Sequence, residues 1–196
     1  MAVLDIDQKT TALVVIDLQK GIASMGRTLA PNSVETVVGN AAKLADAFRR
    51  NGMPVFLVHV AASPAESLSP LSDEQPWKRD GLPPDWADFV PAMGPKESDI
   101  IITKKQWGAF YGTDLELQLR RRGISTIVLC GISTNHGVES TARFAYEYGF
   151  QQIFAEDAMS SMSAEMHNFA ISAVFKRIGR VRQTVEIIES LNPTKT

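Results

Sequence analysis

The chain has 196 residues, 44% of them apolar, so it can bury one sizeable core, and we predict a single domain spanning residues 1–196. Its 20 Lys and Arg residues and 22 Asp and Glu residues give a net charge of −2, without a long run of either sign. This balance argues against nucleic acid or an anionic membrane as a partner and favours a small-molecule substrate.

Three further features bear on the location of the protein in the cell. No apolar stretch approaches the ~20 residues that a membrane-spanning helix needs. Residues 1–11 lack the basic start and apolar middle of a secretory signal. A single cysteine cannot form an internal disulfide, which is typical of a reducing compartment. We therefore expect a cytoplasmic protein without a membrane partner.

Short apolar runs alternate with longer helical patterns along the chain. The runs predict strands at residues 12–17, 54–60, 100–103, 126–131, 152–156 and 181–185. Helical spacing of apolar residues, each time followed by a glycine, predicts helices at residues 34–50, 114–122, 136–148 and 163–178. This alternation predicts an α/β fold with three α/β/α layers and a mainly parallel, six-stranded, Rossmann-like sheet. Ligands are expected beyond the carboxyl ends of its strands.

Residues 63–96 interrupt this alternation. The segment carries seven of the ten prolines, together with Trp77 and Trp86. A connection of this length without regular structure is usually functional, so we predict a long loop or lid within the domain, with a disordered insertion as the alternative.

Two charged residues stand at the ends of predicted strands. Asp17 closes the first apolar run, and Lys104 directly follows the run at residues 100–103. Because the carboxyl ends of parallel strands meet at one edge of a sheet, the two opposite charges are expected to share a crevice. Burial would raise the pKa of Asp17, whereas a neighbouring cation would lower it. Each residue by itself could instead be a solvated strand end or a helix cap.

Side chains close to these two residues are candidates for substrate binding. Gln19 follows Asp17, and Trp107 and Phe110 follow Lys104. The two aromatic rings could line an apolar pocket or belong to the core.

A glycine-bounded turn at residues 131–137 joins a predicted strand to a predicted helix. Its backbone N–H groups and the helix dipole could hold an anionic ligand or a developing oxyanion. Four of its residues are candidates for contacting substrate: Ile132, Ser133, Asn135 and His136. The turn matches neither a P-loop nor a dinucleotide-binding glycine motif, so a nucleotide is not expected.

The single cysteine, Cys130, is a candidate nucleophile by its chemistry. It continues the apolar run of residues 127–129, however, where burial raises a thiol pKa and a cysteine behaves as a small apolar residue. A nucleophile would be better placed near Gly137, where the helix dipole favours a thiolate. We therefore assign Cys130 to the core.

Three blocks of sequence resemble the isochorismatase-like, or cysteine hydrolase, superfamily, which includes nicotinamidases, N-carbamoylsarcosine amidases and isochorismatases. The blocks are residues 14–19 (VVIDLQ), Lys104 followed by residues 108–110 (GAF), and residues 130–142 (CGISTNHGVESTA). Their order and spacing agree with the family from residue 11 to about residue 186, and weaker likeness covers residues 156–158 and 165–167. The resemblance implies an isochorismatase-like hydrolase fold and a homo-oligomer with a partner segment over the active site.

The resemblance also implies roles for individual residues. In the amidase branch the catalytic residues are an Asp, a Lys and a Cys, which correspond to Asp17, Lys104 and Gly137, so the nucleophile is missing here. The isochorismatase branch has glycine at that position too and cleaves a vinyl ether by proton transfer. We therefore predict a hydrolase of a small carboxylated or cyclic substrate, in which Asp17 donates a proton and Lys104 holds a substrate carboxylate.

Two alternatives to this function stay open. One is an amidase-like hydrolase that uses water, and the other is a non-catalytic binding or assembly protein that has lost its nucleophile. The residues 133–135 (Ser-Thr-Asn) resemble the amidase branch rather than the Tyr-Ala-His of isochorismatases, and Val60 or Ala61 stands where isochorismatases have a glutamine.

We predict no metal and no cofactor. Nicotinamidases hold a metal with an aspartate and histidines after the second strand, where this chain has only His59, and the three histidines lack a recognisable ligand spacing. We expect His59 to be a strand residue and His167 a helix-surface residue, whereas His136 lies within the glycine-bounded turn at residues 131–137, where it could contact substrate. The family commonly has a non-proline cis peptide that corresponds to Ile132–Ser133.

Overall fold

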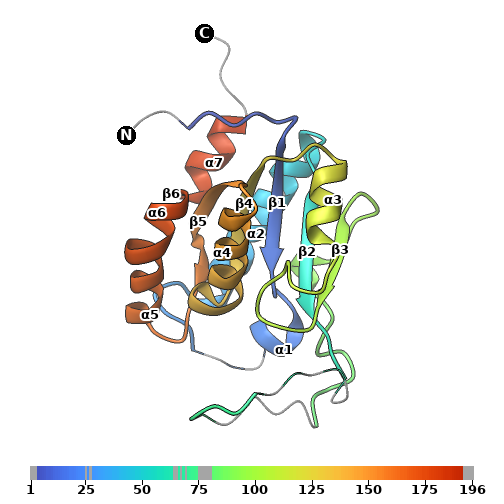
Figure 1. Cartoon of the computed structure of the whole chain (residues 1–196), viewed down its shortest axis with the longest axis vertical. Helices are drawn as coiled ribbons and strands as arrows, with labels where there is room; N and C mark the ends of the chain where they lie inside the picture. The colour runs from blue at the N-terminus through green and yellow to red at the C-terminus, as the bar shows by residue number, and fades with distance from the viewer. Residues whose placement is uncertain are drawn as a thin grey trace.

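The computed structural model describes residues 4–24, 26, 28–63, 66, 68, 70–74 and 81–191. Within these residues one sheet contains six strands: β1 (Thr11–Ile16), β2 (Val55–Val60), β3 (Ile100–Lys104), β4 (Thr126–Ile132), β5 (Gln151–Ser160) and β6 (Arg180–Arg182). Their order is β3-β2-β1-β4-β5-β6, and every neighbouring pair is parallel (Figure 1). The predicted α/β fold with a six-stranded sheet is confirmed.

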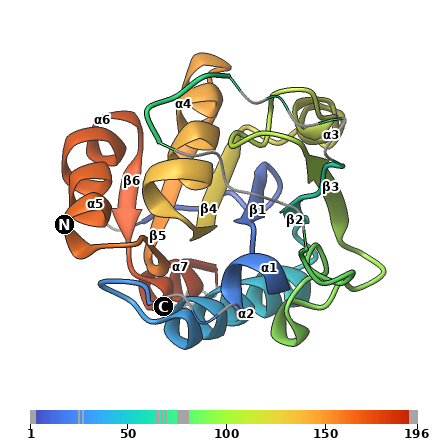
Figure 2. The same ribbon diagram turned by 90° about the horizontal axis from the view of Figure 1, so that it is seen from below.

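Helices cover both faces of the sheet (Figure 2). One face is covered by α2 (Val34–Arg50) and α7 (Thr184–Leu191), with the short helices α1 (Lys20–Ala23) and η2 (Pro91–Met93) nearby. The other face is covered by α3 (Leu115–Arg121), α4 (Glu139–Glu147) and the continuous run of α5 (Ala164–Phe169), η4 (Ala170–Phe175) and α6 (Lys176–Ile178). The π-helical turn η3 (Thr134–Val138) leads from β4 into α4. No helix in the described part of the chain is long and apolar enough to cross a membrane.

The central strand β1 is apolar at nearly every position because it contributes to two cores. Leu13 and Val15 pack with α2 and α7, whereas Val14 and Ile16 pack with α3 and α4. All six residues of β1 are buried. Alternate side chains of a strand point to opposite faces, so a strand covered on both faces shows no polar alternation.

Helix α2 has the bounds that its sequence predicts. The Ser33 side chain accepts a hydrogen bond from the Thr36 amide at 3.2 Å and so caps the first turn. The helix stops before Asn51 and Gly52, and Gly52 takes the left-handed φ of 66° that ends many helices.

The prediction of a strand at residues 181–185 was wrong in its second half. Strand β6 ends at Arg182, and α7 begins at Thr184. Glu186 reaches back to accept a hydrogen bond from the Gln183 amide at 2.8 Å, and Asp157 accepts from both the amide and the hydroxyl of Thr184 at 2.7 Å. These carboxylates cap a helix that apolar periodicity alone did not reveal.

The remaining elements differ from prediction mainly in length. β5 extends to Ser160, because it regains pairing with β4 after a register shift between Leu129 and Gly131. The predicted helices at residues 136–148 and 163–178 each contain a π-helical stretch, η3 and η4.

The predicted lid at residues 63–96 is described only in part, and Trp77 lies outside the described residues. Its later portion is joined to α1 by an ion pair between Lys20 and Asp85 at 2.7 Å, and by a hydrogen bond from the Gly21 amide to the Trp86 carbonyl at 2.7 Å. Whether the segment acts as a lid stays a prediction.

Candidate active site

Asp17 is the first residue after β1, at the carboxyl edge of the sheet. Its backbone has a φ of 54°, the left-handed region that aspartate adopts more readily than most residues. Its amide donates to the Val58 carbonyl at 2.9 Å, which holds the chain against β2. The residue is 4% exposed, so its carboxylate is buried at the end of the central strand.

Lys104 reaches this carboxylate from β3, on the far side of β2. Its Nζ lies 2.8 Å from Asp17 Oδ2 and donates a second hydrogen bond to the Gln106 carbonyl at 3.0 Å. Both side chains are buried. The structure confirms that the two opposite charges lie together at one edge of the sheet, as their positions at strand ends predict, and it shows them as a buried ion pair.

The two oxygens of Asp17 have different surroundings. Oδ2 faces Lys104, whereas Oδ1 is buried without a hydrogen-bond partner among the described residues. Burial raises the pKa of Asp17 above its usual range, whereas the charge and hydrogen bond of Lys104 and, more weakly, the charge of His59 and the Val60 backbone amide oppose the rise. Asp17 therefore keeps its proton at a higher pH than an ordinary aspartate does.

The active turn, residues 131–138, begins with a close approach between β4 and β1. Gly131 has a φ of 123°, and a Cβ atom at this position would lie 2.0 Å from the Ile16 carbonyl oxygen. Only glycine fits there. The Ile132–Ser133 peptide is cis, as expected, and the amides of His136 and Val138 both donate to the Ser133 carbonyl at 3.1 and 3.2 Å. The turn is thereby folded against the end of β1.

Gly137 lies next to the carboxylate. A Cβ atom at this position would be 3.2 Å from Asp17 Oδ2 and 3.0 Å from Ile16 Cγ2. The Gly137 carbonyl accepts a hydrogen bond from Thr141 Oγ1 at 2.7 Å, and the same hydroxyl accepts from the Ala109 amide at 3.0 Å. Thr141 thus joins the active turn to the chain after Lys104. Sequence reasoning missed this residue, although its position four residues after Gly137 on one helix was a usable signal.

Trp107 and His136 form a partly open wall beside Gly137. Their rings meet edge to face with centroids 4.7 Å apart, and Trp107 is 62% exposed. His136 Nδ1 lies 3.1 Å from Asn135 Oδ1, and that oxygen also accepts a hydrogen bond from the Ser161 hydroxyl. Burial lowers the pKa of His136, so its ring is uncharged at neutral pH. Trp107 thus contacts the active turn, to which His136 and Asn135 belong, and the turn meets the Asp17 carboxylate at Gly137.

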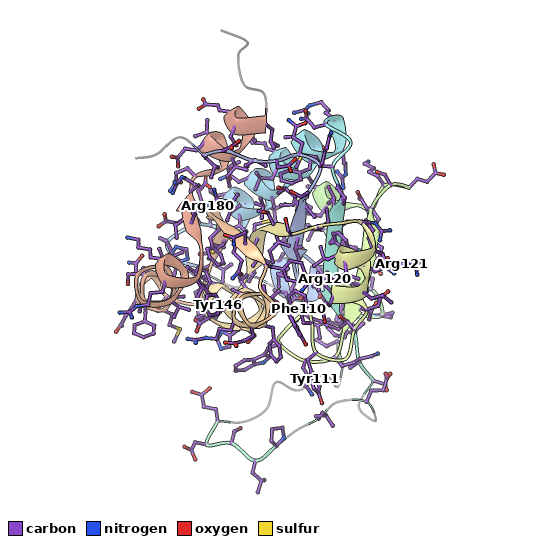
Figure 3. The ribbon with its side chains drawn as sticks, turned by 45° about the horizontal axis from the view of Figure 1, so that its top comes forward. Phe110, Tyr111, Arg120, Arg121, Tyr146 and Arg180 are labelled. Atoms are coloured by element: carbon purple, nitrogen blue, oxygen red, sulfur yellow. The ribbon has the colours of Figure 1, made fainter. Side chains whose placement is uncertain are left out.

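Two predicted substrate-binding residues lie in the framework of the site instead. The Gln19 amide is fully buried: its oxygen accepts from the Val60 amide at 2.8 Å, and its nitrogen donates to the carbonyls of Val60 and Trp86 at 3.0 and 3.3 Å. Phe110 is buried in the core, and its ring centroid lies 5.9 Å from that of Phe150. Figure 3 labels Phe110 and the next residue, the exposed Tyr111. Of the two positions that the sequence allows for Phe110, the structure shows the one in the core.

Cys130 is fully buried within β4, and burial raises the pKa of its thiol, with Asp157 adding to the rise. This placement confirms its assignment to the core. A buried neutral thiol is a poor nucleophile.

The prediction that His167 lies on a helix surface was wrong. Its side chain is fully buried because α5 packs against η3, and its Nδ1 lies 2.8 Å from Thr134 Oγ1. His59 lies on β2 and contacts the Ala87 carbonyl and the Thr103 hydroxyl at 2.7 and 2.8 Å. Within the residues that the structure describes, no three His, Cys, Asp or Glu side chains are grouped so that they could hold a metal ion.

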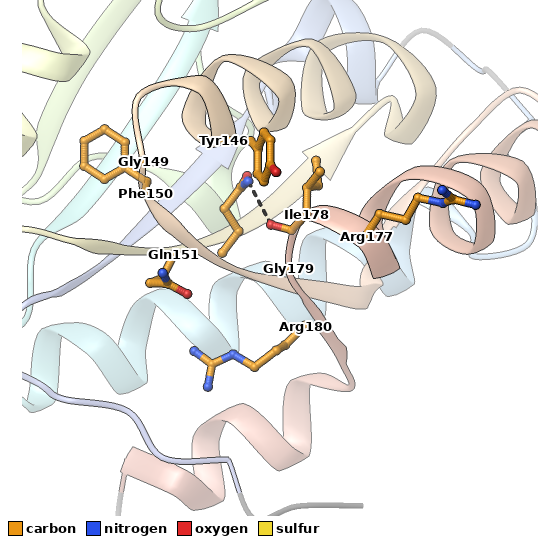
Figure 4. Close-up of a pocket in the computed structure, with 9 residues that line it drawn as sticks. Tyr146, Gly149, Phe150, Gln151, Arg177, Ile178, Gly179 and Arg180 are labelled. Atoms are coloured by element: carbon orange, nitrogen blue, oxygen red, sulfur yellow. Dashed lines mark hydrogen bonds between the residues drawn. The ribbon is translucent and has the colours of Figure 1, made fainter.

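A hollow of about 350 Å³ lies at the opposite edge of the sheet, where β5 and β6 begin. It is lined by residues of the segments 146–152 and 177–180, and Arg177 and Arg180 point to different sides of it (Figure 4). It contains none of the residues that converge near Asp17. The site at the carboxyl edge is therefore the candidate active site.

A family model of the isochorismatase domain matches residues 11–186, which include Asp17, Lys104 and the active turn. The chain belongs to the isochorismatase family. Its relatives include an uncharacterised isochorismatase family protein, YecD, of Escherichia coli O157:H7, with 56% identity over 96% of this chain and 100% of the relative. An isochorismatase family protein from Burkholderia thailandensis has the same fold, with a TM-score of 0.90 and 42% identity over 97% of this chain and 99% of the other.

More distant relatives of this isochorismatase-family hydrolase carry the names of two different enzymes. A probable isochorismatase of Pseudomonas chlororaphis is 29% identical over 96% of this chain and 89% of its own length. The N-carbamoylsarcosine amidase of an Arthrobacter species is 25% identical over 92% of this chain and 71% of its own length. The family therefore includes members named for different reactions, so the geometry of the site, rather than the names of relatives, must indicate the reaction of this chain.

Proposed function

We propose that this isochorismatase-family hydrolase cleaves a small carboxylated or cyclic substrate of the vinyl-ether type by proton transfer from Asp17. The observation that carries the proposal is the unequal environment of the Asp17 carboxyl group. Lys104 lies against Oδ2, whereas Oδ1 is buried with no partner in the described chain. Because burial raises the pKa of Asp17, the carboxyl group can hold the proton that the reaction needs.

In the proposed reaction Asp17 gives its proton to the terminal carbon of the enol ether, and the electrons of the C=C bond form the new C–H bond. A water molecule attacks the oxocarbenium carbon, and one of its protons returns to Asp17. The resulting hemiketal breaks its C–O bond, with its hydroxyl proton passing to the leaving oxygen, and releases an alcohol and a carbonyl compound. Lys104 holds the substrate carboxylate and stabilises the Asp17 carboxylate once its proton has left.

We also propose that Gly137 stands where amidase members of the family have their nucleophilic cysteine. A Cβ atom at this position would lie 3.2 Å from Asp17 Oδ2, which is a suitable place for a group that Asp17 would deprotonate. Without a side chain at position 137 no thioester can form there, and Cys130 is buried in β4. This favours proton transfer over covalent amide hydrolysis.

A substrate screen tests the proposed reaction. The purified protein is incubated with isochorismate, simple vinyl ethers, and small amides that include nicotinamide and N-carbamoyl compounds, and the products are identified by mass spectrometry. We expect turnover of a vinyl ether and a loss of about 100- to 10,000-fold in kcat in Asp17→Asn. Lys104→Ala should also abolish measurable turnover, whereas Cys130→Ala should retain it. Hydrolysis of amides alone, or loss of activity in a folded Cys130→Ala variant, would contradict the proposal.

The Gly137→Cys variant tests whether the other residues of the site can support amide hydrolysis once a cysteine is supplied at position 137. The added Cβ atom must displace its neighbours by a few tenths of an ångström, so Gly137→Ala serves as the control for crowding. Amide hydrolysis by the cysteine variant but not by the alanine variant would support the assignment of position 137. If the wild-type protein and both variants convert no compound in the screen, the proposed reaction fails, and the alternative of a non-catalytic binding protein is favoured.

A further inference from the structure

His167 is the inward-facing residue of a helix whose neighbouring side chains face solvent. Helix α5 starts after Ser163, whose hydroxyl caps the helix by accepting a hydrogen bond from the Met166 amide at 3.2 Å. Met166 and Phe169 are 46% and 65% exposed, whereas His167 is fully buried. The helix thus inserts one polar ring into the protein, towards η3.

The ring meets the first residue of η3. His167 Nδ1 lies 2.8 Å from Thr134 Oγ1, and both residues are 0% exposed. This hydrogen bond joins α5 to the active turn across 33 residues of sequence. Among the hydrogen bonds of the described residues, it is one through which α5 can hold the turn in place.

The second ring nitrogen shows that His167 is not a packing residue alone. Its Nε2 is buried and has no hydrogen-bond partner within the described ranges. A buried polar atom without a partner is unfavourable, so an apolar side chain of similar size would fill the same space at lower cost. The gain that offsets this cost lies in the hydrogen bond between Nδ1 and Thr134. Burial also lowers the pKa of His167, which keeps the ring neutral and suited to a single hydroxyl partner.

Displacement of Thr134 would move the groups that face Asp17. Thr134 directly follows Ser133, whose carbonyl accepts hydrogen bonds from the amides of His136 and Val138. Gly137 lies between those two residues, where a Cβ atom would be 3.2 Å from Asp17 Oδ2. A shift at the start of η3 would therefore change the distance between the turn and the carboxyl group.

We propose that His167 is a positioning residue that holds Thr134, and through it the active turn, at its working distance from Asp17. The effect of His167 on turnover rests on the proposed function, but its effect on the position of the active turn, through the hydrogen bond to Thr134, does not. It can therefore be tested by a measurement that needs no substrate.

Four variants separate the hydrogen bond from the shape of the ring. His167→Phe keeps a ring and removes both nitrogens, and Thr134→Val keeps the shape of threonine and removes the hydroxyl. His167→Asn keeps a polar atom near the position of Nδ1, and Thr134→Ser keeps the hydroxyl. Ser163→Ala is the matched control, because it removes the cap of α5 and leaves the bond between His167 and Thr134 in place.

The first measurement is backbone amide hydrogen exchange of the active turn in each variant. His167→Phe and Thr134→Val should each raise the exchange rates there by about tenfold, and the double variant should raise them no further. His167→Asn and Thr134→Ser should remain close to wild type, and Ser163→Ala should speed exchange in α5 but not in the turn. Unchanged exchange in His167→Phe, or additive effects in the double variant, would overturn the proposal.

The second measurement is turnover of the substrate that the screen identifies. His167→Phe should lower kcat by about 100-fold with KM little changed, and His167→Asn should recover most of the loss. A purely structural role predicts a lower melting temperature without this change in kcat and without rescue by asparagine, and that result would overturn a positioning role in catalysis. If wild type converts no substrate, the proposed function fails, and hydrogen exchange still decides whether His167 holds the turn.

Discussion

Replacing Gly131 by alanine should destabilise the protein far more than an ordinary substitution of glycine. The new Cβ atom would lie 2.0 Å from the Ile16 carbonyl oxygen, whereas real Cβ contacts below 3.0 Å are essentially never found, so the ends of β1 and β4 must separate by roughly 1 Å. The backbone is also held at a φ of 123°, which disfavours any side chain. These two strands are central and buried on both faces, so neither can move without disturbing the core.

The magnitude can be separated into two parts. The left-handed backbone contributes about 1–2 kcal/mol. The forced overpacking between strands contributes about 1–3 kcal/mol or more. Gly112→Ala is the matched control, because Gly112 has a φ of 67° and a Cβ atom added there would have no neighbour within 4 Å, so only the backbone part remains. We therefore expect a loss of about 2–5 kcal/mol for Gly131→Ala and about 1–2 kcal/mol for Gly112→Ala.

Urea denaturation of the two variants measures both free energies of unfolding, and thermal unfolding provides a second reading. For a domain of this size each kcal/mol lowers the melting temperature by about 2–4 °C. Equal destabilisation of the two variants would refute the reasoning, since it would mean that the approach of Gly131 to Ile16 carries no structural cost.

Three further predictions concern the site and its framework. Because the pKa of Asp17 is raised in the folded state, the folded protein binds more protons than the unfolded chain. The free energy of unfolding of wild type should therefore fall, relative to that of Asp17→Asn, as the pH rises from about 4 through the raised pKa. Urea titrations across this pH range measure the difference, and the opposite slope would refute the prediction. Gln19→Leu removes the side-chain partner of the Val60 amide and carbonyl and one of the two donors to the Trp86 carbonyl, so it should lower the free energy of unfolding by about 2–4 kcal/mol. The exposed Gln151→Leu should change this free energy by less than about 0.5 kcal/mol, and similar effects of both variants in urea denaturation would contradict the framework role. Cys130 should react with a thiol reagent only after unfolding, because burial raises the pKa of its thiol, and rapid labelling of the native protein would show that the assignment to the core is wrong.

The strands and the two charged residues could be predicted because their signals are local. An unbroken apolar run such as that of β1 is typical of a strand buried on both faces, and the polar residue that ends such a run stands at the edge of the sheet. Once the alternation with helices indicated parallel strands, Asp17 and Lys104 had to lie at the same edge. The role proposed for position 137 came from the resemblance to the family, because no local pattern contains it.

The remaining features depend on contacts between distant segments. Nothing near Gly131 in the sequence reveals that its Cα approaches Ile16, since this follows from the pairing of β1 with β4. The surface position predicted for His167 rests on residue type alone, since His167 stands three, four and seven residues before the buried Ala170, Ile171 and Val174 and shares their helix face. Its partner, Thr134, lies in another element, and the backbone partners of Gln19 are likewise supplied by distant residues, Val60 and Trp86. Apolar periodicity reports which face of an element is buried, but not what it is buried against. The sequence by itself therefore determined the fold class and the edge that holds Asp17 and Lys104, whereas only tertiary packing decided which polar groups hold the active turn beside them.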